Sequence, residues 1–226
     1  MSAYDDRGRY EEEEAMERFL AEQLREMSEG PVIYYLARNG DAIEERVQQC
    51  RKEATELTSL GFYGAALVRL AAAIEITIRF FLARPLVQGA FLSDEWAELL
   101  SKKILNGRSA EDRELLPAIL RNWNLDITKL TLPDGGSLWD QIVNRVWHCR
   151  NDYVHAGAVI SERDARVAAE CLDVMLDQVV SPIAKRLGFT REDTGRWSVI
   201  LSRHDRNLNP PTRHETVSPF RDSTTA

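Results

Sequence analysis

The stretch FYGAALVRLAAAIEITIRFFLA, residues 62–83, decides the fold class of this chain. It predicts a strongly apolar helix that Gly61 separates from the preceding helix and that Pro85 ends. A membrane span needs about 20 predominantly apolar residues, whereas Arg69, Glu75 and Arg79 interrupt this segment. We therefore exclude a membrane span and expect a helix of a folded domain.

Helical periodicity continues on both sides of this segment. The first helix should end at Gly30-Pro31, and Pro182 should kink or divide the last one. Gly157 should end the helix that precedes the last one. Candidate N-caps are Ser93, Ser109 and Ser161, the last with the spacing of a capping box to Asp164. The only candidate strand is residues 32–36, and a single strand forms no sheet. The sequence therefore predicts an all-α fold, with further helices over residues 11–29, 41–59, 94–105, 110–123, 138 to the 150s, and 161–187.

Composition places the chain among ordinary globular proteins. Of its 226 residues, 44% are hydrophobic and 29% are charged, which excludes collagen-like, fully disordered and disulfide-scaffold classes. The three cysteines, at positions 50, 149 and 171, are odd in number and far apart, so a reducing compartment is expected. No signal peptide is recognised at the N-terminus. These features predict a cytoplasmic protein.

Charge divides the chain into three parts. Residues 1–30 carry ten acidic side chains and four arginines, a net charge of −6, whereas the whole chain carries −7. We interpret them as an acidic amphipathic arm that docks elsewhere, packs on the body, or covers a basic cleft. Residues 31–201 form the helical domain, with its core at about 41–188. Residues 202–226, rich in Pro, Asn, Ser and Thr, are expected to be a disordered tail.

The stretch VWHCRNDYVHAG, residues 146–157, contains the candidate catalytic groups. RNA can be cleaved without a metal when the adjacent 2′-hydroxyl is the nucleophile. His155 can act as the base or acid. Arg150 can clamp the phosphate and stabilise its charge, and Asn151 can orient a phosphate oxygen or the imidazole. The two remaining histidines, at positions 204 and 214, lie in the predicted tail.

The segment from Arg150 to His155 resembles the R-x(4–6)-H motif of the HEPN superfamily, including the asparagine directly after the arginine. Its place late in a helix, before a final long helix, is similar too, as is the long apolar helix 62–83. The resemblance implies a HEPN-like helical bundle and a metal-independent endoribonuclease without cofactors that leaves 2′,3′-cyclic phosphate and 5′-hydroxyl ends. It also implies that the protein acts in host defence or in a stress response.

The spacing of the motif poses a geometric problem. Residues five apart on a regular helix lie about 140° apart around its axis, so Arg150 and His155 do not share a face. Either the helix ends or kinks between them, or the site lies at an interface. The resemblance implies the second, because HEPN proteins usually form homodimers that place both motifs in one cleft.

Two carboxylates are candidate supporting residues. Asp152 can pair with Arg150, as Glu162 also can. Glu75 lies among isoleucines, where a charged side chain needs a partner. It either forms an ordinary i,i+4 pair with Arg79 or orients the arginine or histidine of the motif.

Other functions stay open at this point. No spacing of cysteines and histidines is typical of zinc, so no metal is expected. Trp139, Trp147 and Tyr153 can stack on bases, although such aromatics more often form core or dimer contacts. The alternatives to an endoribonuclease are a non-catalytic helical module that binds RNA or a partner protein, and a structural helical dimer. A regulatory partner protein is a further expectation.

Overall fold

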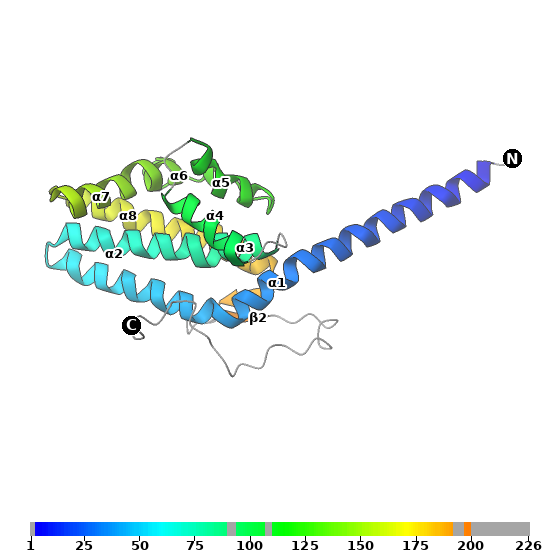
Figure 1. Ribbon diagram of the computed structural model, residues 1–226, viewed down its shortest axis with the longest axis horizontal. Helices are drawn as coiled ribbons and strands as arrows, with labels where there is room; N and C mark the ends of the chain where they lie inside the picture. The colour runs from blue at the N-terminus through cyan, green and yellow to red at the C-terminus, as the bar shows by residue number, and fades with distance from the viewer. Residues whose placement is uncertain (1–2, 90–93, 107–109, 192–196, 200–226) are drawn as a thin grey trace.

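The computed structural model describes residues 3–89, 94–106, 110–191 and 197–199, and it is predominantly helical (Figure 1). This confirms the all-α prediction. The only strands in the described part of the chain are β1 and β2, which pair antiparallel with Phe189 opposite Val199. The elements are α1 Ala3–Ser59, α2 Tyr63–Ile76, η1 Thr77–Ala83, α3 Arg84–Gly89, α4 Asp94–Asn106, α5 Ala110–Arg121, η2 Ile127–Lys129, α6 Leu138–Asp140, η3 Gln141–Val146, α7 Trp147–Ala156, α8 Glu162–Met175, η4 Leu176–Val180, α9 Ser181–Arg186, β1 Phe189–Arg191 and β2 Trp197–Val199.

The apolar helix α2 is the centre of the bundle. It packs against both α1 and α8, and α7 crosses its N-terminal half (Figure 1). Leu67, Leu70 and Ile74 of α2 are at most 3% exposed. Fully burying one such side chain contributes about 1.5–3 kcal/mol. Burial of α2 against several neighbours explains why its sequence is apolar around most of its circumference.

The predicted helix end at Gly30-Pro31 is wrong. The first helix, α1, runs without interruption from Ala3 to Ser59, with Pro31 inside it. Proline within a helix costs about 3 kcal/mol, but Val32, Tyr35 and Leu36 immediately beyond it are buried against the body. This burial offsets the lost hydrogen bond. The segment 32–36 is therefore helical and not a strand.

The N-terminal part of α1 projects away from the bundle instead of packing on it (Figure 1). The acidic segment 1–30 is thus continuous with the first core helix from Ala3 onward. Glu29 lies where this helix meets the body, and its Oε1 is 3.8 Å from Arg186 Nε of α9.

The prediction that Pro85 ends the apolar helix is also wrong, and the structure explains how Pro85 and Pro182 are tolerated. Each follows a π-helical segment, η1 and η4 respectively. In a π-helix each carbonyl accepts a hydrogen bond from the N–H five residues later, instead of four as in an α-helix. The bond from Arg84 N–H to Arg79 O is an example. The carbonyl four residues before the proline therefore does not depend on the N–H group that proline lacks. At Pro182 the predicted division of the helix takes the form of a change from π-helical hydrogen bonding in η4 to α-helical hydrogen bonding in α9.

Several local predictions are confirmed. Gly61 has φ +79° at the end of α1, and Gly157 has φ +66° at the end of α7. Ser161 and Asp164 form a capping box at the start of α8. The predicted caps at Ser93 and Ser109 and the tail 202–226 lie outside the described residues.

In the described part of the chain, no helix combines the length and apolar character that crossing a membrane requires.

The three cysteines are unpaired; Cys50 and Cys171 are buried and Cys149 is half-buried. Burial raises the pKa of the Cys171 thiol to about 12.

Candidate active site

Both motif residues lie on one uninterrupted α-helix. Helix α7 spans Trp147–Ala156, so it neither ends nor changes register between Arg150 and His155. The first solution to the geometric problem of the motif, a break between the two residues, is therefore wrong. Around the axis of α7 the two residues lie about 140° apart.

The side chain of Arg150 is held by its neighbour. Its Nη1 donates a hydrogen bond to Asn151 Oδ1 at 2.9 Å. Asn151 precedes His155 by four residues, so the two lie on nearly the same face of α7, about 40° apart. The hydrogen bond therefore directs the guanidinium toward the face that carries His155. Asn151 acts on the arginine, and not on the imidazole in this structure.

Glu75 of α2 lies close enough to Arg150 for their charges to interact. Burial raises the pKa of the Glu75 carboxyl above its ordinary value, and the positive charges of Arg150 and Arg79 oppose this rise. Arg79 itself forms an ion pair with Glu98 of α4, so the simple Glu75–Arg79 pair is not the arrangement found. Glu75 and the motif arginine, which are far apart in the sequence, thus interact through their charges.

Asp152 has a different partner from the one expected. Its Oδ2 lies 3.3 Å from His148 Nε2, one helical turn earlier on α7. The alternative partner of Arg150, Glu162, accepts instead from the Tyr63 hydroxyl at 3.5 Å. The sequence interpretation missed the His148–Asp152 pair, although its i,i+4 spacing on a predicted helix was a usable signal.

An exposed polar face therefore runs along α7. His148 and His155 are seven residues apart, which places them within about 20° of each other around the axis. Asn151 and Asp152 lie between them on the same face. The side chain of His148 is 73% exposed and that of Asp152 is 47% exposed. We call these four residues, His148, Asn151, Asp152 and His155, the histidine face.

The opposite side of α7 packs very closely on α2. The ring of Tyr153 lies over Gly64 so tightly that a Cβ at Gly64 would sit 2.1 Å from Tyr153 Cε2. Only glycine leaves room for this contact. Trp147 at the start of α7 packs edge-to-face on Trp139, with ring centroids 5.9 Å apart. The predicted role of these aromatics in packing is thus the one that their contacts support.

Hydrogen bonds fix both ends of the loop that follows His155. At Gly157 the chain adopts a left-handed conformation, and its N–H donates to the carbonyl of Tyr153 at 3.2 Å. At the far end of the loop, Asp164 of α8 is fixed by Arg145 of η3. Its Oδ1 accepts hydrogen bonds from Arg145 Nε at 3.1 Å and Nη2 at 2.9 Å. Burial alone would raise the pKa of Asp164, but hydrogen bonds from Ser161 and Arg145 hold it below its ordinary value.

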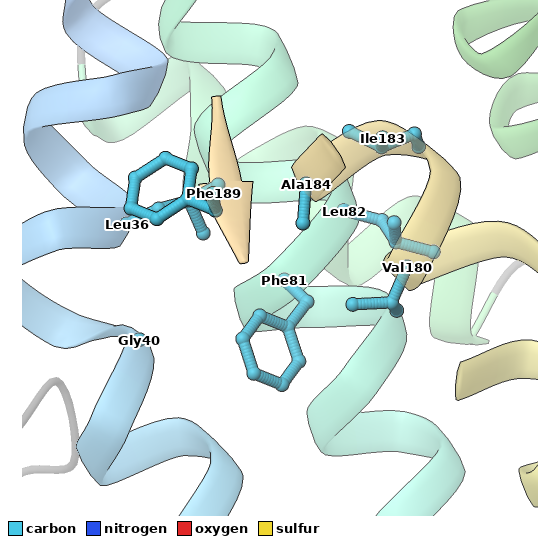
Figure 2. Close-up of a pocket in the computed structure, with 8 residues that line it drawn as sticks. All are labelled: Leu36, Gly40, Phe81, Leu82, Val180, Ile183, Ala184 and Phe189. Carbon is cyan, nitrogen blue, oxygen red and sulfur yellow. The ribbon is translucent and has the colours of Figure 1, made fainter. Parts of the chain in front are cut away.

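Two hollows in the part of the chain that the structure describes lie away from this face. One of about 360 Å³ is bordered by α5, η2, α6 and η3, with Arg113, Trp139 and Asp140 among its lining residues. A small apolar hollow of about 20 Å³ lies between α1, η1, η4, α9 and β1 (Figure 2). The histidine face is therefore an exposed surface, which suits a polymeric substrate better than a small enclosed one.

Within the described residues, no three side chains of histidine, cysteine, aspartate or glutamate lie close enough together to hold a metal ion. Comparison with known proteins adds no relative. No protein-family model, no curated protein and no solved structure matches this chain.

Proposed function

We propose that this protein is a HEPN-type endoribonuclease that cleaves RNA without a metal ion or other cofactor, with Arg150 and His155 as catalytic residues. The 2′-hydroxyl attacks the adjacent phosphorus, His155 transfers a proton, and Arg150 stabilises the negative charge that develops on phosphate. The observation that carries the proposal is the Arg150–Asn151 hydrogen bond, which directs the guanidinium toward the face of His155.

The arrangement of helices supports a bundle of the HEPN type. The motif lies on α7, directly before the long final helical segment formed by α8, η4 and α9. Helix α7 packs on the apolar helix α2, and the charge of Glu75 on α2 interacts with that of Arg150. In the proposal Glu75 holds Arg150 in place by charge, and it does not contact substrate.

We extend the proposal to a homodimer. Large exposed apolar side chains gather at the end of the bundle where His155 lies, and burying them in a second copy would remove them from water. They come from the α1–α2 turn, from α7 and from the loop after it: Leu60, Phe62, Tyr153, Val154 and Val159. The resemblance further suggests a cytoplasmic role in defence or stress and a regulatory partner protein, for which the acidic part of α1 is the candidate contact.

Cleavage of RNA in excess EDTA tests the proposed reaction. We expect the wild-type protein to cleave RNA to 2′,3′-cyclic phosphate and 5′-hydroxyl ends. Loss of a general acid or base costs about 10²–10⁴-fold, so His155→Ala should slow cleavage by that factor. Arg150→Ala should slow it about 10²–10³-fold, as for loss of a group that stabilises transition-state charge. Arg163→Ala, which removes an exposed arginine from the neighbouring helix α8, is the matched control.

Two other outcomes would contradict the proposal. Equal cleavage by all four proteins would show that the nuclease is a contaminant or acts at another site. RNA binding by the wild type without cleavage, abolished by Arg150→Ala, would favour the non-catalytic binding module.

A further inference from the structure

We propose that His148 is a second catalytic residue of the same site, the general acid that protonates the leaving 5′-oxygen, while His155 is the general base. This inference rests on the proposed endoribonuclease function and deepens it, because it assigns both proton transfers to one chain. The motif itself contains only one histidine, so without His148 the second proton transfer would depend on the motif histidine of the partner copy in the homodimer.

The geometry of α7 carries the inference. His148 and His155 lie on the same exposed side of a regular helix, two turns apart, which separates their Cα atoms by about 10 Å along the axis. Imidazole side chains on such a spacing can reach opposite sides of a phosphodiester group that lies between them. Arg150 lies on another side of α7, and its hydrogen bond to Asn151 directs the guanidinium toward the side that carries the histidines, where it could meet the phosphate charge.

The contact of His148 with Asp152 assigns the roles. The carboxylate lies 3.3 Å from His148 Nε2, where it can hold the imidazole in one orientation, and a histidine positioned in this way takes the role of the acid. The other charged groups on or beside α7 are Arg150, whose charge interacts with Glu75 of α2, and Arg145 of η3, which pairs with Asp164. His155 forms no ion pair with a carboxylate in the described part of the chain, and it takes the role of the base.

The reaction then balances within one active site. His155 takes the proton of the 2′-hydroxyl as the 2′-oxygen forms its bond to phosphorus. The bond between phosphorus and the 5′-oxygen breaks, and the imidazolium of His148 gives its proton to that oxygen. The products are a 2′,3′-cyclic phosphate and a 5′-hydroxyl, and proton exchange with water restores both histidines.

A substrate with a better leaving group tests this assignment. RNA with sulfur in place of the bridging 5′-oxygen expels a thiolate, which needs no general acid because a thiol is far more acidic than an alcohol. On ordinary RNA in EDTA, His148→Ala and His148→Gln should slow cleavage about 10²–10⁴-fold. On the sulfur-substituted RNA they should cleave nearly as fast as the wild type, whereas His155→Ala should be slow on both substrates.

Two companion variants sharpen the test. Asp152→Asn should slow cleavage less than His148→Ala, and the sulfur-substituted substrate should relieve its defect too, which a general loss of structure would not allow. Arg163→Ala should behave as the wild type on both substrates.

The outcomes separate this inference from the proposed function. If His155→Ala is inactive while both His148 variants match the wild type on ordinary RNA, the second catalytic residue is disproved and the endoribonuclease stands. The same holds if the His148 variants are equally slow on both substrates, since a general acid would be bypassed by sulfur. If the wild type cleaves neither substrate, both proposals fail.

Discussion

The two ends of the bundle differ most clearly at two glycines that both lie inside helices. Gly64 of α2 lies under the ring of Tyr153 at the end that carries the histidine face, and it has no room for a side chain. Gly40 of α1 borders the apolar hollow at the other end, and a Cβ there would meet nothing within 4 Å (Figure 2). The same residue type thus serves a tight contact at one end and leaves a packing defect at the other.

This difference indicates where the molecule requires a defined geometry. Close packing holds side chains in place, because displacing either partner loses many short-range contacts at once. Helix α7 is held this way on α2 and by the hydrogen bonds around Asp164. The end around Gly40 is apolar and loosely filled, so it contributes stability without positioning a functional group.

The largest expected effect is at Gly64. Alanine normally stabilises a helix relative to glycine, but at this position the new Cβ would overlap Tyr153, and such overpacking costs about 1–3 kcal/mol. We expect Gly64→Ala to lower the free energy of unfolding by that amount, measured by urea denaturation, and to reduce RNA cleavage because α7 is displaced.

A double-mutant cycle isolates the cause. In a Tyr153→Ala background the added Cβ meets no ring, so Gly64→Ala should there become neutral or stabilising. If Gly64→Ala costs the same with and without the tyrosine, the tight contact is not the reason and the contrast between the two ends fails.

A smaller effect of the opposite sign is expected at Gly40. Alanine removes the entropic cost of glycine in a helix, about 0.5–1 kcal/mol, and its methyl group enters the hollow. Gly40→Ala should therefore raise the melting temperature by about 1–4 °C for a domain of this size. Gly30→Ala, at another helical glycine with nothing within 4 Å, measures the gain from helix propensity alone. A loss of stability at Gly40 would show that this end is packed as tightly as the other.

The smallest change in stability is expected at Glu75, where burial of the charge and attraction to Arg150 oppose each other. Because the folded-state pKa of Glu75 is raised, the folded state holds its proton more tightly than the unfolded state does. Stability is therefore lost as pH rises from the unfolded-state pKa, about 4.3, through the folded-state pKa. Glu75→Gln should gain stability relative to the wild type over this range.

Urea denaturation at several pH values between about 4 and 7 measures this difference, with Glu45→Gln at an exposed position of α1 as the control. If the free energies of unfolding of wild type and Glu75→Gln change in parallel with pH, burial of the Glu75 charge does not destabilise the folded state. The same variant should cleave RNA more slowly, since Arg150 loses the charge that holds it.

Local sequence determined much of this structure. The apolar segment 62–83 and the helical periodicity around it predict the helix class correctly, and the capping box at Ser161 and the break at Gly157 depend on residues only a few positions apart. These features follow from short-range hydrogen bonds and backbone preferences, which the sequence states directly.

Tertiary contacts decided what the sequence rules did not. Pro31 lies inside α1 because Val32 and Leu36 are buried beyond it, and Pro85 follows a π-helical change of register. The candidate site divides in the same way. The sequence predicted a helical stretch that contains Arg150 and His155, whereas the absence of a break between them and the interaction of Glu75 with Arg150 appear only in the folded structure. Contacts between distant segments depend on how faces fit together, and no local pattern contains that information.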